Sequence, residues 1–91
     1  MDAIQAVRDF FDRHLNVSAE VRRYLGVGAN VSRRHLIQHL VERTIRRASL
    51  DAATQRALGS DDEGEVSWEH CLMVAALTEL RPLRLLARGP V

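Results

Sequence analysis

The sequence contains no lysine, a single cysteine and few aromatic residues. All thirteen basic residues of the 91-residue chain are arginines, and arginine favours planar, bidentate contacts over the loosely solvated contacts of lysine. Cys71 has no second cysteine with which to form a disulfide within the chain, which is typical of a reducing compartment or of a bridge between chains. Twelve acidic residues nearly balance the arginines, and the net charge of +1 indicates no class of partner.

Long apolar runs are also missing. No run approaches the about 18 apolar residues that a membrane-spanning helix needs. The N-terminal sequence MDAIQAVRDFF is amphipathic and lacks the basic and apolar regions of a secretion signal. We therefore expect a cytoplasmic protein. With 46% apolar and 27% charged residues, the composition is typical of a folded chain, and its length fits one domain with a thin core.

Apolar residues recur at helical spacing in several segments, which predicts an all-α fold with four helices. A third and shorter helix can be capped by Ser49 or Asp51, and Ser67 can cap the fourth. The fourth helix should end near Arg81, because Pro82 disfavours the helical conformation in the preceding residue and has no amide hydrogen. The expected helices span residues 2–15, 32–47, 49–58 and 68–81.

Residues 16–30 lack a clean apolar period. They contain two glycines and two asparagines, which are typical of loops. We expect a long loop here, with room for a short turn of helix.

The expected fourth helix is apolar on almost every side. Helices of this kind are buried on more than one side. Because a chain of 91 residues has little with which to cover such a helix, we predict a homodimer. The apolar residues are Cys71, Leu72, Met73, Val74, Ala75, Ala76, Leu77 and Leu80.

Residues 59–70 have the spacing of a calcium-binding EF-hand loop around Gly64. Such a loop places oxygen ligands at positions 1, 3, 5, 7, 9 and 12, with glycine at position 6 and a bidentate glutamate at position 12. With Gly64 at position 6, position 1 is Gly59 and position 12 is His70. The loop thus lacks roughly three of about seven oxygen ligands, and we expect calcium binding to be weak or absent. The remaining ligand positions belong to Asp61, Glu63, Glu65 and Ser67.

No other metal site and no catalytic site are indicated. His35 and His39 lie four residues apart, a spacing that can bind zinc, but no third ligand accompanies them. Cys71 follows His70 directly, yet neighbours along a helix point about 100° apart, and no orienting acid is identifiable. We expect neither a cofactor nor enzymatic activity.

Three segments resemble the S-100 family of small dimeric EF-hand proteins, which includes the calcyclins, the calgranulins and the calpactin light chain. The resemblance covers nearly the whole chain, although the first loop is longer than usual and both loop-closing glutamates are absent. It implies one domain of residues 1–91, built from two helix-loop-helix units with degenerate loops, at 2–47 and 49–81, and a basic tail at 82–91. The segments are DFFDRH, VSRRHLIQHLVERTI and DEGEVSWEHCLMVAALTEL.

The resemblance also implies a symmetric dimer and a cleft that binds an amphipathic segment of a target protein. In the family, the calpactin light chain has lost calcium ligands and binds its target permanently. We therefore expect a calcium-independent interaction module. The dimer interface implied by the family pattern consists of Ile4, Val7, Phe11, Leu72, Ala75 and Ala76. The implied target cleft consists of Leu50, Leu58, Leu77, Leu80, Leu85 and Leu86.

An arginine-rich segment, SRRHLIQHLVERTIRR, leaves a second class of function open. It could be the basic helix of a small helical nucleic-acid-binding domain, whose binding would depend strongly on salt. The near balance of acids and arginines and the absence of lysine weigh against this alternative. The arginines concerned are Arg33, Arg34, Arg43, Arg46 and Arg47.

Overall fold

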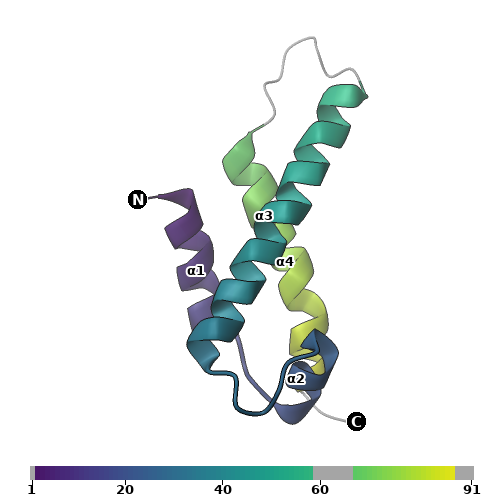
Figure 1. Ribbon diagram of the computed structural model, residues 1–91. Helices are drawn as coiled ribbons and strands as arrows, with labels where there is room; N and C mark the ends of the chain where they lie inside the picture. Colours follow the sequence, from purple (N-terminus) through teal and green to yellow (C-terminus); the bar gives the residue numbers. More distant parts are fainter. Residues whose placement is uncertain (1, 59–66, 88–91) are drawn as a thin grey trace.

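Four α-helices form the described part of the computed structural model, which comprises residues 2–58 and 67–87 (Figure 1). No strand occurs in these residues. The predicted all-α class and the number of helices are confirmed, but the four helices differ from those expected. They are α1 (Ala3–His14), α2 (Ala19–Leu25), α3 (Arg33–Ala57) and α4 (Trp68–Ala87).

The two helices expected over 32–47 and 49–58 are one continuous helix, α3. It begins where the sequence predicted a helix start, and the Ser32 hydroxyl caps it by accepting a hydrogen bond from the amide of His35 at 3.2 Å. Ala48 and Ala52 are buried, so the packed side of the helix continues across the expected break. The predicted interruption between two helices was wrong, because a residue such as Ser49 can cap a helix but does not interrupt one.

The expected loop over residues 16–30 contains a seven-residue helix, α2. The Ser18 hydroxyl caps its first turn by accepting a hydrogen bond from the amide of Val21 at 3.2 Å. Gly26 ends the helix in the left-handed conformation, with φ at 73°, which glycine adopts without strain. Val21 and Leu25 are buried, so this helix covers part of the core.

The expected end of the fourth helix near Arg81 was wrong, because α4 continues through Pro82 to Ala87. Proline inside a helix costs about 3 kcal/mol, since it cannot donate to the carbonyl four residues earlier and its ring crowds that carbonyl. Leu83 is buried and Leu86 packs against the core. Burial of a leucine contributes about 1.5–3 kcal/mol, so packing of the last turns offsets the cost of the proline.

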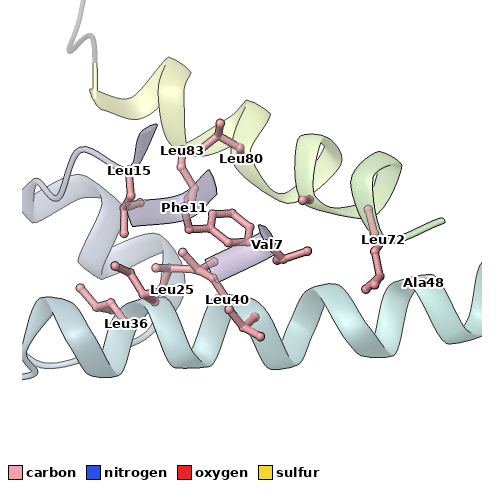
Figure 2. Packing of buried hydrophobic residues seen from close by; sticks show 14 of the residues in the cluster. Val7, Phe11, Leu15, Leu25, Leu36, Leu40, Ala48, Leu72, Leu80 and Leu83 are labelled. Atoms are coloured by element: carbon pink, nitrogen blue, oxygen red, sulfur yellow. The ribbon is translucent and has the colours of Figure 1, made fainter. Parts of the chain in front are cut away.

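The core lies where α1, α3 and α4 meet. Helices α3 and α4 run antiparallel, α1 packs against both, and α2 packs against α4 (Figure 1). Phe11 of α1 is fully buried at the centre of this core, between Leu40 of α3 and Leu83 of α4 (Figure 2). The chain therefore buries an apolar core without contribution from a second copy.

A buried carboxylate joins α3 to α4. The Glu79 side chain is 6% exposed, and its Oε1 lies 3.0 Å from Nε of Arg43. Its Oε2 accepts a hydrogen bond from Nε of Arg47 at 2.8 Å. Residues 43 and 47 stand one turn apart on α3, so both guanidinium groups reach the same carboxylate. Burial of the carboxylate is tolerated because both of its oxygens have charged partners.

Removal of this carboxylate should destabilise the protein. We expect Glu79→Ala to lower the free energy of unfolding by about 1–3 kcal/mol, because the half-buried Arg43 and the more exposed Arg47 lose their shared partner. Urea unfolding followed by circular dichroism measures the change. The control is Glu42→Ala, since Glu42 is exposed and accepts one hydrogen bond, from Gln38; it should shift stability by no more than about 0.5 kcal/mol. Equal effects of the two substitutions would contradict a special role for Glu79.

Replacement of the proline should have the opposite effect. We expect Pro82→Ala to raise the free energy of unfolding by about 1–2 kcal/mol, because alanine supplies the missing amide donor and removes the crowding ring. The gain is smaller than the full cost of a helical proline because Pro82 is partly buried, so that loss of the ring also exposes apolar surface to water. The same urea experiment measures it. A loss of stability would mean that the packing of the ring matters more than the amide.

Candidate functional site

Helix α4 has a buried side and an exposed side. On the buried side lie Cys71, Leu72, Ala75, Ala76, Leu80 and Leu83. The exposed side carries several apolar residues and two arginines. Its residues 74, 77, 81 and 85 follow one another at intervals of three or four, which places them on the same side of the helix. We call this set the outer face. Its members are Met73, Val74, Leu77, Arg81, Arg84 and Leu85.

The outer face contains large apolar side chains that water reaches. Leu77 is 51% exposed and Leu85 is 62% exposed. Single exposed leucines are common on protein surfaces, but apolar side chains gathered on one side of one helix are typical of an interaction site. Other helices cover the buried side of α4, so within residues 2–58 and 67–87 the outer face is the side of this largely apolar helix that no other element covers.

A hollow of about 350 Å³ lies on the C-terminal half of the outer face. It is lined by Leu77, Leu80, Arg81, Arg84 and Leu85. Leu80 is buried, and the two arginines are exposed. Within residues 2–58 and 67–87, neither arginine has an ion pair. The hollow therefore combines an apolar surface with two positive charges that are available to an outside partner.

The structure brings together half of the predicted target cleft. Leu77, Leu80 and Leu85 line the hollow on α4, and Leu86 is partly buried against the core. Leu50, on α3, instead lines a separate hollow of about 300 Å³ beside Arg43, Arg46, Arg47, Asp51 and Glu79. Leu58 follows the last residue of α3 and is highly exposed.

The predicted dimer interface lies inside the single chain. Five of its six residues are buried in the core, namely Val7, Phe11, Leu72, Ala75 and Ala76, while Ile4 packs against that core. Contact with a second copy through these residues would require the core of each chain to open. The homodimer itself stays a prediction.

The remnant of the calcium loop is described only at its end. Asp61, Glu63 and Glu65 lie outside the described residues. The Ser67 hydroxyl accepts a hydrogen bond from the amide of His70 at 3.2 Å, so it caps the first turn of α4 as predicted. His70 is exposed. In the part of the chain that the structure describes, no three histidine, cysteine or acidic side chains gather closely enough to hold a metal ion.

The arginine-rich segment of α3 contains five arginines. Three of them make contacts within the chain. Arg33 lies 3.6 Å from the Asp12 carboxylate and donates hydrogen bonds to the carbonyls of Asp12 and Leu15, so it holds the end of α1. Arg43 and Arg47 hold Glu79. The other two arginines of the segment, Arg34 and Arg46, have no ion pair among the described residues.

A hollow of about 570 Å³ between α1 and α3 mixes charges of both signs. Three arginines and two aspartates line it together with Ile37, and the opposite charges largely offset one another. It therefore gives no preference for an anion or a cation. The arginines are Arg8, Arg33 and Arg34, and the aspartates are Asp9 and Asp12.

The helices and the comparisons with known proteins both bear on the kind of protein. None of the described helices is both long enough and apolar enough to cross a membrane. Comparison of the chain with protein-family models, curated proteins and solved structures finds no match. The resemblance to the S-100 family therefore rests on the quoted sequence segments alone.

Proposed function

We propose that this chain is a calcium-independent protein–protein interaction module, whose outer face binds an amphipathic helical segment of another protein. The observation that supports the proposal most directly is the hollow at Leu77 and Leu85, where exposed leucines lie beside two arginines. Amphipathic helices bind apolar surfaces of this kind through side chains spaced three, four and seven residues apart. The role is one of binding rather than catalysis.

The length and charge of the outer face define the partner segment. From Met73 to Leu85 the face spans twelve residue steps, which is about 18 Å at 1.5 Å per residue. A partner helix of about three turns covers that length. Arg81 and Arg84 lie toward one end, and guanidinium groups pair well with carboxylates. We therefore propose a partner with an apolar stripe and acidic residues near one end.

The proposed binding does not require calcium. The acidic loop lacks a carboxylate at its first ligand position, and a histidine, His70, stands where the bidentate glutamate should be. The start of α4 is organised instead by the Ser67 cap, which needs no metal ion. Cys71 is a free, buried thiol, which is in keeping with a module that acts in the cytoplasm.

A designed peptide can test the docking face. The probe is a helical peptide of about 15 residues with leucines three and four residues apart and two glutamates near one end. We expect saturable binding in fluorescence anisotropy. A matched peptide with lysines in place of both glutamates should bind at least roughly tenfold more weakly, because it places positive charges beside Arg81 and Arg84.

Paired variants locate the binding. Leu77→Asp should weaken peptide binding at least roughly tenfold, because burial of a leucine contributes about 1.5–3 kcal/mol and each 1.4 kcal/mol is a factor of ten. Leu50→Asp makes the same change at an exposed leucine of α3 and should leave the affinity unchanged. Equal loss in both variants, or in neither, would contradict docking on the outer face. Affinities in chelator and in millimolar calcium should agree; a requirement for calcium would contradict that part of the proposal.

A further inference from the structure

The hollow of about 300 Å³ where α3 meets Glu79 of α4 shares no residue with the outer face. We propose that it binds a phosphomonoester group, which pairs with the guanidinium groups of Arg43, Arg46 and Arg47. This goes beyond the proposed function, because it concerns a different surface and a different class of ligand.

The three arginines lie on one side of α3. Arg43, Arg46 and Arg47 are separated by three and four residues, and Leu50 follows at the same intervals, so their side chains project in similar directions. Like charges at these intervals destabilise a helix. A bound anion relieves this repulsion, so the cluster attracts an anion more strongly than one isolated arginine would.

Glu79 positions two of the arginines without using all of their donors. Arg43 and Arg47 both reach its carboxylate through Nε. Their Nη groups make no hydrogen bond within residues 2–58 and 67–87 and face no competitor there for a ligand oxygen. Because Glu79 already restrains these two long side chains, a ligand that binds them loses less free energy to ordering.

Arg46 adds a charge that nothing in the described part of the chain offsets. It is exposed, lines the same hollow, and has no ion pair among the residues described. Three guanidinium groups against the one carboxylate of Glu79 leave a net charge of +2. A phosphomonoester carries about two negative charges near pH 7 and offers three acceptor oxygens. Guanidinium groups bind such oxygens in pairs, which favours phosphate over a single carboxylate.

Asp51 and Leu50 complete the lining and restrict the rest of the ligand. Asp51 is exposed and has no ion pair among the described residues, so it repels a second negative group. Leu50 is 69% exposed and offers an apolar surface to the carbon atoms of the ester. The ligand is therefore one phosphomonoester on an uncharged carrier. A phosphoserine side chain of another protein and a small free phosphomonoester share this chemistry.

Titration of the full chain with inorganic phosphate tests the site. In NMR spectra of the arginine Nε–H groups, we expect saturable shifts at Arg43, Arg46 and Arg47. Arg56 should not shift, because it is exposed in the last turn of α3 and does not line the hollow. Dimethyl phosphate, a diester with a single negative charge, should bind roughly three- to fivefold more weakly. Shifts that do not saturate, or equal affinity for the two anions, would overturn the proposal.

Two substitutions should change phosphate affinity in opposite directions. Arg46→Gln should weaken binding at least roughly fivefold, because a charged donor is lost. Asp51→Asn should strengthen binding by roughly two- to fivefold, because a repelling charge is lost. The matched control is Arg56→Gln. Arg56 lies ten residues beyond Arg46, about 15 Å along the helix and farther than the Debye length of about 10 Å.

The control should therefore shift the affinity by less than roughly twofold. Circular dichroism checks that all three variants remain folded. Equal losses in Arg46→Gln and Arg56→Gln, or weaker binding by Asp51→Asn, would contradict an anion site in this hollow.

Two phosphomonoesters distinguish the sources of the ligand. One is a short blocked peptide with leucine beside phosphoserine, and the other is glycerol phosphate. Binding of the peptide at least roughly threefold tighter would assign the hollow to a phosphorylated protein segment, because leucine can pack on Leu50. Equal or weaker binding of the peptide would assign it to a small free phosphomonoester. The peptide with aspartate in place of phosphoserine should bind at least roughly tenfold more weakly; equal binding would overturn the preference for phosphate.

Discussion

The contact between Glu79 and its two arginines sets how α4 is rotated against α3. A buried carboxylate without partners costs several kcal/mol, so α4 has to present Glu79 to Arg43 and Arg47. That single orientation turns Leu72 and Leu80 into the core and leaves Leu77 in water. A rotation of α4 by one residue, about 100°, would strand the carboxylate. The contact of Glu79 with its arginines, on the opposite side of the helix, therefore decides which residues of α4 lie on the outer face.

Local signals in the sequence predicted where helices begin better than where they end. The first helix was predicted over 2–15 and spans Ala3–His14, the predicted helix start at Ser32 is confirmed, and so is the predicted cap at Ser67. A cap is a contact among neighbouring residues, so the sequence displays it directly. The ends of α3 and α4 depend on distant partners: Ala52 and Leu83 are buried against other helices, and that burial outweighs the local signals at Ser49 and Pro82.

The candidate site was predictable only in part for a related reason. A helix that is apolar on almost every side does not reveal which side its own chain will cover, so the prediction placed Ala75 and Ala76 at an interface although they lie in the core. Arg81 and Arg84 held the missing information, because both fall on the exposed side. The sequence also did not reveal the partners of the arginines on α3. Arg33 and Arg47 read as a basic surface, but their partners, Asp12 and Glu79, are distant in sequence.

The division of α4 into two sides also bears on how the protein can change over evolutionary time. Stability resides on the side that carries Leu72, Glu79 and Leu83, whereas Leu77 and Leu85 contribute little to the core because they are largely exposed. Exposed substitutions away from caps and ion pairs usually shift stability by no more than about 0.5 kcal/mol. New side chains can therefore be tried on the outer face without unfolding the chain, and one scaffold can acquire different partners while its fold is preserved.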